Sequence, residues 1–278
     1  MRKNLFTLIA FLFLIQSSFA QITFPRNGVY DNRDGLYAFT NATIHKTFNT
    51  TIDNATLLIR KGKIEAVGAG ITVPAEAVVI DLKGKHIYPS LIDIYSSYGL
   101  PERKRDRDNN RTRGIQQMVT NKDGAYMWNQ ALRPEFRAHE VFTPSAKSAK
   151  EMRKMGFGAV LAHQMDGISR GTSTFVTLGD DPAHETILKD MASHHMSFSK
   201  GISTQSYPGS LMGGIALLRQ TYLDSEWYKN HGHKEEFNIS LASWNEVQSL
   251  PQIFEVRDRL DILRVAKIGK EFGIKYIY

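Results

Sequence analysis

The chain has 278 residues, of which 42% are hydrophobic and 23% charged, and its formal net charge is +7. This composition excludes a protein made mostly of membrane spans and leaves enough apolar residues for a sizeable core. The chain contains no cysteine, which excludes disulfides, thiolate nucleophiles and cysteine-ligated metals.

Residues 1–20 have the features of a secretory signal peptide. Arg2 and Lys3 form a positive start, an apolar run extends from Leu5 to Ile15, and residues 18–20 read SFA, a small-x-small cleavage site. The apolar run is too short to span a bilayer, and no cysteine follows it to carry a lipid. We therefore predict an exported protein, periplasmic or extracellular, with no transmembrane span once the signal is removed.

Residues 21–85 predict a small β unit. Residues 35–45 alternate between apolar and polar side chains, as expected for a strand. The apolar runs 56–60 and 64–68 are joined by Lys61-Gly62-Lys63, which predicts a β-hairpin. A third run at 78–81 and a second Lys-Gly-Lys turn complete the unit.

The pattern changes at His86. Residues 86–95 form a nearly continuous apolar run, which predicts a strand buried on both faces. Thr143 and Pro144 predict the start of a helix that ends at Gly156. Strands are then expected at 157–162, 252–256 and 274–278, and helices at 211–228 and 259–272. This alternation predicts βαβ units, a parallel sheet and the α/β class.

Three polar segments are candidate binding sites. Residues 102–113 are rich in Arg and Lys but hold no aromatic side chain, which favours a solvated loop over a nucleic-acid surface. His194-His195 and His231-Gly232-His233 are expected in polar loops without a carboxylate partner, so a metal site is not favoured there. Residues 167–172 favour a turn between strands over an anion-binding cradle.

The stretch from Lys83-Gly84-Lys85 through Pro89-Ser90-Leu91-Ile92-Asp93 is the most specific pattern. It resembles the amidohydrolase superfamily, especially imidazolonepropionase-like members and exported tandem amidohydrolase-like proteins of Bacteroidetes type. The resemblance covers about residues 36–278, with weaker support at 156–171 and 251–278. It implies a TIM-like (β/α) barrel preceded by a small β-sandwich, and metal-dependent hydrolysis of non-peptide carbon–nitrogen bonds.

The resemblance also implies the domain organisation. We expect a signal peptide at 1–20, the β-sandwich part of a composite domain at 21–85, and an incomplete (β/α) barrel at 86–278. A complete barrel takes about 250 residues, more than this last stretch provides. We therefore expect an N-terminal part of a longer protein, with the downstream half of that protein as its partner.

The metal-binding positions that the resemblance implies are occupied by other side chains. In the family, histidines follow the aspartate equivalent to Asp93 two and four residues later, so that both point into the barrel mouth. Here these positions are Tyr95 and Ser97, which are poor ligands for zinc-like cations. A second histidine pair falls at Glu255 and Arg257, and arginine has no lone pair to give. We predict no metal cofactor in this segment, and a divalent metal such as zinc only in the remainder of the protein.

The pocket-mouth candidates are Asp93, Tyr95, Ser97, Glu255, Arg257 and His163, which follows a predicted strand at the rim. His163 either lines a pocket or is a hydrogen-bonded rim histidine. The leading hypothesis is an exported hydrolase of small molecules whose catalytic centre lies outside this segment. The alternative is an inactive amidohydrolase-fold scaffold or binding domain, a pseudoenzyme. A carbohydrate- or peptide-binding protein is less favoured, because Trp128, Trp227 and Trp244 are scattered.

Overall fold

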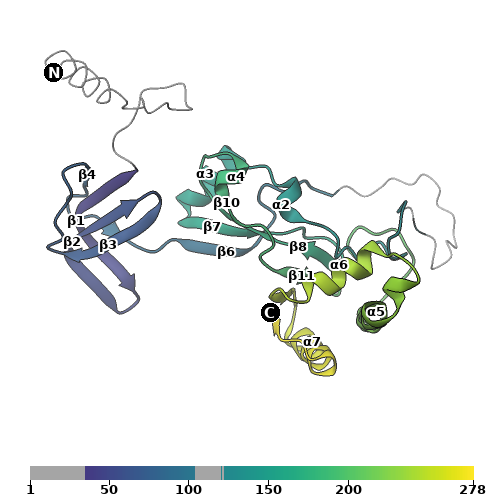
Figure 1. The fold of residues 1–278 in the computed structure, drawn as a ribbon. Helices are drawn as coiled ribbons and strands as arrows, with labels where there is room; N and C mark the ends of the chain where they lie inside the picture. The colour runs from purple at the N-terminus through teal and green to yellow at the C-terminus, as the bar shows by residue number, and fades with distance from the viewer. Residues whose placement is uncertain (1–34, 104–119, 121) are drawn as a thin grey trace, which may run out of the picture. The chain divides into compact units, whose positions relative to one another are not determined.

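A computed structural model describes residues 35–103, 120 and 122–278. The described residues form two compact units, divided between Pro89 and Ser90 (Figure 1). The predicted signal peptide and most of the basic stretch 102–113 lie outside the described residues. Within the described ranges, no helix is both long and apolar enough to cross a membrane.

The first unit is one mixed β-sheet. Its strands are β1 (Leu36–Thr47), β2 (Thr50–Arg60), β3 (Lys63–Ala69), β4 (Val78–Asp81) and β5 (His86–Ile87). The order is β3-β2-β1-β4, and β5 pairs with β1. The predicted hairpin is confirmed: Arg60 lies opposite Lys63, and Lys61 and Gly62 both have positive φ, as a tight hairpin turn requires. The β-sandwich remains a prediction.

The second unit contains two four-stranded sheets. One has the order β10-β9-β7-β6 and the other β13-β12-β11-β8. The strands are β6 (Leu91–Ser96), β7 (Phe157–Ala162), β8 (Ser169–Thr172), β9 (Thr174–Thr177), β10 (Ile187–Lys189), β11 (His194–Met196), β12 (Gln252–Phe254) and β13 (Tyr276–Ile277).

Strand directions in the second unit agree with the predicted α/β class, but the predicted parallel sheet is found only in part, since β9/β10, β7/β9 and β8/β11 are antiparallel. The pairs β6/β7, β11/β12 and β12/β13 are parallel. Strands β8 and β9 are separated by Ser173 alone, and they run antiparallel to β11 and β7 respectively. It follows that β7 and β11 point in the same direction. The α/β class is confirmed, whereas closure into a barrel remains a prediction.

Helices connect these strands (Figure 1). They are α2 (Ala138–Val141), α3 (Ala146–Lys154), α4 (Ala183–Thr186), α5 (Leu211–Asn230), the 3-10 helix η2 (Gly232–Lys234), α6 (Ile239–Val247) and α7 (Arg259–Phe272). Helix α7 has the predicted bounds, because Asp258 accepts hydrogen bonds from the first turn and Gly273 adopts φ +70° at the end. Helix α3 begins later than predicted, since its N-cap is Ser145 and not Thr143.

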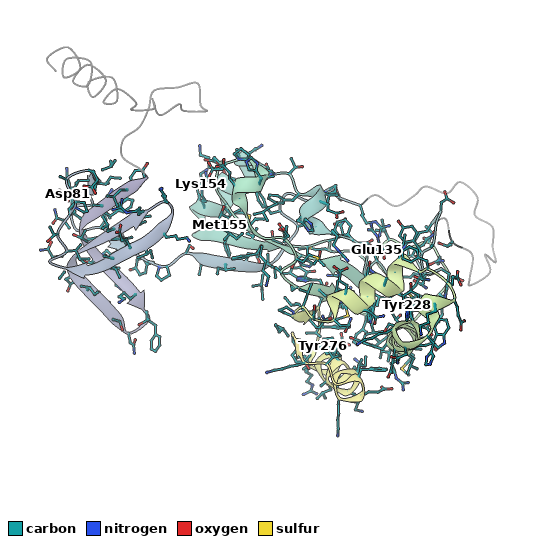
Figure 2. The ribbon with its side chains drawn as sticks, in the orientation of Figure 1. Asp81, Glu135, Lys154, Met155, Tyr228 and Tyr276 are labelled. Carbon is teal, nitrogen blue, oxygen red and sulfur yellow. The ribbon has the colours of Figure 1, made fainter. Side chains whose placement is uncertain are left out.

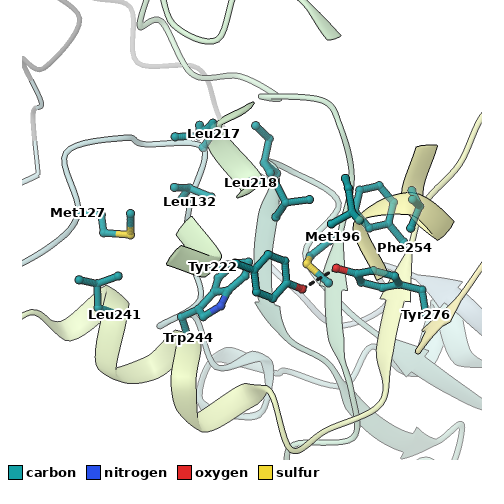
Figure 3. Packing of buried hydrophobic residues seen from close by; sticks show 14 of the residues in the cluster. Met127, Leu132, Met196, Leu217, Leu218, Tyr222, Leu241, Trp244, Phe254 and Tyr276 are labelled. Carbon is teal, nitrogen blue, oxygen red and sulfur yellow. Dashed lines mark hydrogen bonds between the residues drawn. The ribbon is translucent and has the colours of Figure 1, made fainter. Parts of the chain in front are cut away.

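The largest hydrophobic cluster lies between helices α5–α7 and strands β12 and β13 (Figure 3). Trp244 is fully buried and meets the ring of Tyr222 edge-on, with centroids 5.0 Å apart. The hydroxyls of Tyr222 and Tyr276 are hydrogen-bonded at 2.5 Å, which ties β13 to α5 (Figure 3). Phe254 from β12 packs edge-on against the same Tyr276 ring. This cluster fixes β12 and so positions the residues that follow it.

A partly buried ion pair secures the segment before α2. Lys122 Nζ donates to Glu135 Oε1 and to the Leu132 carbonyl, each at 3.0 Å. Glu135, labelled in Figure 2, also accepts a hydrogen bond from Ser240 of α6. Burial lowers the pKa of Lys122, and the nearby Glu135 carboxylate opposes that shift. The contacts hold this irregular segment against α6.

One prediction about the strand after His86 is wrong. The apolar run is split into β5 and β6, because Pro89 has no N–H to give to a strand ladder. Strand β6 is also not buried on both faces: Leu91, Ile92 and Ile94 are each more than half exposed. One edge of β6 pairs with β7, and no strand in the described residues pairs with its other edge. In the described residues β6 is therefore an edge strand that also exposes apolar side chains.

Candidate functional site

The carboxyl ends of the parallel strands bring five polar or aromatic side chains together. Tyr95 lies near the end of β6, His163 follows β7, His195 lies in β11 and Glu255 follows β12, while Arg170 comes from β8. This end of a parallel sheet is where α/β proteins usually carry their binding and catalytic residues. These five residues are called the mouth cluster below.

Glu255 is the centre of the mouth cluster. Its Oε2 lies 2.5 Å from Arg170 Nη2 and accepts a hydrogen bond from the Tyr95 hydroxyl at 2.9 Å. The Arg170 side chain is 4% exposed and that of Glu255 24% exposed. Arg170 Nε also donates to the Gly167 carbonyl at 3.2 Å. A buried guanidinium is thus neutralised by one carboxylate at the edge of solvent.

The electrostatics assign charge states to these groups. Burial opposes ionisation of Glu255, but the Arg170 charge and the hydrogen bonds from Tyr95 and Arg170 hold its pKa below the usual value. Burial, together with the hydrogen bond to Glu255 and its charge, raises the pKa of Tyr95. At neutral pH the contact therefore joins a carboxylate, a guanidinium and a neutral phenol.

The two histidines of the mouth cluster stack on each other. The rings of His163 and His195 are 3.7 Å apart between centroids and 14° from parallel, and Tyr95 meets His163 edge-on at 5.1 Å. Burial and the Arg170 charge lower the pKa of His163 to about 4, with the Leu161 carbonyl opposing the shift slightly. Burial and the neighbouring His163 lower the pKa of His195 well below its ordinary value. Both rings are neutral at neutral pH.

Three buried nitrogen atoms of the mouth cluster lack a hydrogen bond of ordinary geometry to the described residues. They are Nδ1 and Nε2 of His163 and Nη1 of Arg170. His195 Nε2, in contrast, lies 2.9 Å from the Ser193 hydroxyl, which itself lies 2.6 Å from that of Ser173. A buried polar atom without a partner costs folding free energy. The cluster therefore retains hydrogen-bonding capacity that the described side chains do not use.

The predicted polar loop at His194-His195 is wrong. Both residues lie in β11 and are buried, because the strand pairs with β12 and β8. Neighbouring residues of a strand point to opposite faces, so His195 joins the mouth cluster while His194 faces the core. There His194 Nε2 lies 2.9 Å from the Ser169 hydroxyl and Nδ1 lies 2.8 Å from Gln252 Oε1.

Sequence reasoning missed Arg170 and His195. Arg170 was expected in a turn, but residues 169–172 form β8. Both strands are too short for a periodic pattern to show, and His-His gives no apolar signal. The third histidine segment, His231 to His233, follows α5 and runs into the 3-10 helix η2. It lies in the connection between α5 and α6, as expected.

The structure brings Tyr95, His163 and Glu255 together and places the other predicted residues elsewhere. The Asp93 carboxylate accepts a hydrogen bond from the backbone N–H of Tyr95 at 2.9 Å, within the same strand. Arg257 and Glu255 line a cavity of about 430 Å³ with Asp258, Asp261 and Arg264 of the α7 start. Arg257 thus lies on the same cavity wall as Glu255, outside the mouth cluster.

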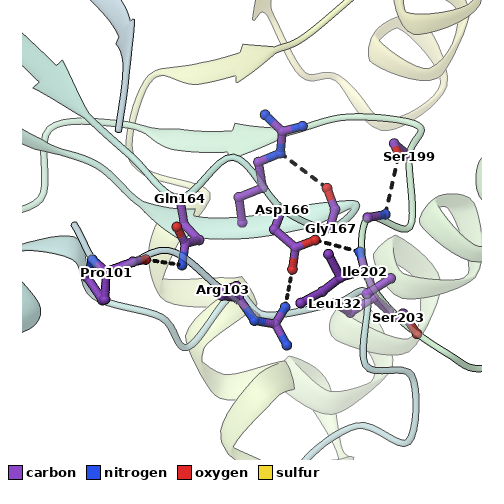
Figure 4. A network of polar contacts seen from close by, with 12 residues as sticks. Pro101, Arg103, Leu132, Gln164, Asp166, Gly167, Ser199, Ile202 and Ser203 are labelled. Atoms are coloured by element: carbon purple, nitrogen blue, oxygen red, sulfur yellow. Dashed lines mark hydrogen bonds and ion pairs between the residues drawn. The ribbon is translucent and has the colours of Figure 1, made fainter. Parts of the chain in front are cut away.

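Ser97 lines a second cavity of about 410 Å³. There Arg103 forms an ion pair with Asp166, whose carboxylate also accepts a hydrogen bond from the Ile202 N–H at 2.7 Å (Figure 4). Gln164 Nε2 donates to the Pro101 carbonyl at 3.3 Å in the same network (Figure 4). These contacts join three loops and give Ser97 no partner in the mouth cluster.

The described residues do not fit the divalent metal that an amidohydrolase-like mouth implies. No three or more His, Asp or Glu side chains among them are placed to hold a metal ion. Glu255 Oε2 is engaged by Arg170 and Tyr95. The parallel rings of His163 and His195 direct their in-plane lone pairs side by side and not toward a common point. We therefore derive no metal-dependent step at this mouth.

Comparison with known proteins places the fold. No family model matches the sequence, and a search of curated proteins finds no match. The structure is similar to the crystal structure of an amidohydrolase from Thermotoga maritima MSB8, with a TM-score of 0.65 and 22% sequence identity. The fold is amidohydrolase-like. The match covers 86% of this chain and 63% of the Thermotoga chain, so this chain spans less than two thirds of that protein's length.

Proposed function

We propose that this chain is part of an exported protein of the amidohydrolase superfamily. We further propose that the complete protein is a hydrolase of non-peptide carbon–nitrogen bonds in a small-molecule substrate. In the part described here, the mouth cluster does not bind a metal ion and instead positions a ligand or a neighbouring protein. The amidohydrolase-like fold supports the superfamily. The signal-like residues 1–20 support export.

The contact of Glu255 with Arg170 and Tyr95 carries the proposal for the mouth. Tyr95 and Glu255 occupy two of the positions where the family resemblance implies metal-binding histidines. Each is bonded to the other or to Arg170, and not left open for an ion. An ion pair in this place substitutes a fixed protein cation for the divalent metal, because Arg170 supplies positive charge at the carboxyl ends of the strands.

Two readings of the whole protein follow, and a different observation favours each. The amidohydrolase-like fold favours a hydrolase whose catalytic centre, with a metal such as zinc, lies in a downstream half. The closed Tyr95–Glu255–Arg170 contact favours a pseudoenzyme that serves as scaffold or binding domain. In both, the exposed apolar side chains of β6 are covered by the downstream half of the same protein.

Metal analysis tests the mouth directly. We expect no zinc bound at the mouth when the purified chain is dialysed against zinc and measured by inductively coupled plasma mass spectrometry. Glu255→Gln is the matched variant, because it removes the carboxylate with little change in shape. Stoichiometric zinc in the parent chain that is lost in Glu255→Gln would refute the proposal.

Activity of the full-length gene product separates the two readings. A hydrolase with a downstream centre should cleave members of a cyclic-amide and acyl-amine panel, lose activity with a chelator, and retain it in Tyr95→Phe. A pseudoenzyme should cleave none of the panel, with or without added zinc. Chelator-sensitive activity that disappears when Tyr95→Phe is introduced would place catalysis at this mouth and contradict both readings.

A further inference from the structure

We propose that His45 and His86 in the first unit form a binding site for a monovalent copper-group cation, Cu(I) or Ag(I). His45 lies in β1 and His86 in β5, which pair in parallel beside each other. The Nε2 atom of His45 lies 2.9 Å from the Nδ1 atom of His86. This pair belongs to the first unit and shares no residue with the mouth cluster, so it is independent of the function proposed above.

The ring geometry points to a linear site. The ring centroids are 5.2 Å apart and the planes differ by 21°. The centroid separation is close to the sum of the 2.9 Å nitrogen–nitrogen distance and the two ring radii. The two facing nitrogens therefore lie almost on the line that joins the ring centres, and their lone-pair directions are nearly collinear. Two collinear imidazole nitrogens match the two-coordinate geometry that monovalent d¹⁰ cations favour. Tetrahedral Zn(II) requires axes that converge at an angle, and tetragonal Cu(II) requires further equatorial ligands beside a collinear pair.

Neighbouring side chains prepare His45 to bind. Its Nδ1 lies 3.1 Å from the Thr51 hydroxyl, whose oxygen can accept a hydrogen bond from the Nδ1–H tautomer and so leave Nε2 with its lone pair free as a ligand. The Tyr88 ring lies parallel to that of His45, with an angle of 1° and centroids 4.3 Å apart, and so holds its plane. The Asp53 carboxylate accepts a hydrogen bond from Thr43, which pairs with His86 across the strands, and adds negative charge to this region.

Binding exchanges one hydrogen bond for two coordinate bonds. Without the cation, one facing nitrogen carries the proton shared between the rings. With the cation, each facing nitrogen gives its lone pair, and the proton moves through solvent to the other nitrogen of the same ring. No net proton is released from neutral rings. The rings separate along their common axis to admit the ion, and both side chains lie at the surface where such movement is open to them.

The absence of cysteine makes the site testable with silver. The chain has no thiol to outcompete imidazole for Ag(I), and the histidine variants separate binding at this pair from binding by the thioethers of its 9 methionines. We expect isothermal titration of the whole chain with silver nitrate, in chloride-free buffer at pH 7.5, to show one site per chain. His45→Asn and His86→Asn should each weaken it at least about tenfold, and Thr51→Val about tenfold. His184→Asn should leave it unchanged, because that exposed histidine lies beside the Glu185 carboxylate and is not part of the His45–His86 pair.

Either of two titration results would overturn the proposal. One is Ag(I) affinity equal in the parent, His45→Asn and His86→Asn chains, which would assign binding to methionines or another group. The other is tight binding of Zn(II) or Cu(II) at the two histidines with none of Ag(I), which would refute the linear geometry. Nitrogen-15 spectra of the parent chain give a second measurement that needs no variant: Ag(I) should shift His45 Nε2 and His86 Nδ1 together. A parent chain whose two signals do not move would also refute it.

Discussion

Replacing Glu255 with glutamine tests whether buried Arg170 depends on a single carboxylate. The variant keeps the shape of the side chain but leaves the guanidinium, 4% exposed, without a counter-charge. Removing one partner of a buried pair costs about 3–5 kcal/mol, and the 24% exposure of Glu255 places this case at the low end, about 3 kcal/mol. Tyr95→Phe removes one hydrogen bond at a half-exposed position and should cost about 1 kcal/mol.

The assay is urea unfolding of the second unit at pH 7, monitored by tryptophan fluorescence. Glu271→Gln is the matched control, because Glu271 Oε1 also lies 2.5 Å from an arginine, Arg219, but both side chains are exposed. We expect a much smaller loss of stability there, since surface pairs contribute little. A Glu255→Gln change no larger than that of Glu271→Gln would refute the reasoning.

The effect of Glu255→Gln should depend on pH. The folded-state pKa of Glu255 is held below its ordinary value, mainly by Arg170 acting against burial. The ion pair therefore stabilises the fold fully above the unfolded-state pKa of about 4.3, and this contribution is lost as pH falls through the lower folded-state value. The difference between the parent chain and Glu255→Gln should shrink below about pH 4. A difference that stays constant down to pH 3 would contradict this account.

Three further predictions concern stability. Burial is the main reason why the folded-state pKa values of His163 and His194 are lowered to about 4. Each histidine therefore gains its proton first in the unfolded state, and the fold should lose about 1 kcal/mol of stability per histidine and pH unit as pH falls from 6.5 toward 4. His194→Gln should flatten this slope in urea titrations, and an unchanged slope would argue against it. Gly171→Ala should cost more than about 2 kcal/mol of stability in calorimetry, because the added Cβ would clash with the Phe136 carbonyl oxygen. Gly273→Ala, with a similar φ but open space around it, should cost about 1 kcal/mol. Equal costs would contradict the steric argument. Trp244→Ala should cost about 3–5 kcal/mol in urea unfolding, because the ring is fully buried, and a loss under 1 would mean that the site collapses around the cavity.

Elements with local signals were predictable from the sequence. Helix α7 has its predicted bounds, and the structure shows that both of its end signals, Asp258 and Gly273, lie next to it in the chain. The hairpin of β2 and β3 was predicted because Lys61-Gly62 supplies the turn geometry within two residues. Strand β7 likewise has its predicted bounds, 157–162, since its apolar run follows a helix-ending glycine.

The candidate site was predictable only in part. Tyr95, His163 and Glu255 were named because a resemblance and a strand end pointed to them, and the structure joins them. Arg170 and His195 were missed because strands β8 and β11 exist through pairing with distant strands. The exposure of β6 was missed for a related reason: an apolar strand is buried only if other elements pack on the faces of its sheet.

The sequence by itself determined the local elements, the α/β class and the replacement of the expected histidines by Tyr95 and Ser97. These follow from periodicity, caps and residue chemistry, which act between near neighbours. Only the tertiary structure decided that Glu255 meets Arg170 and Tyr95, that His163 stacks on His195, and that His45 faces His86. Each of those contacts joins residues from different strands, and strand pairing fixes which side chains meet. The mouth of this amidohydrolase-like fold is therefore defined by an ion pair that no single stretch of sequence reveals.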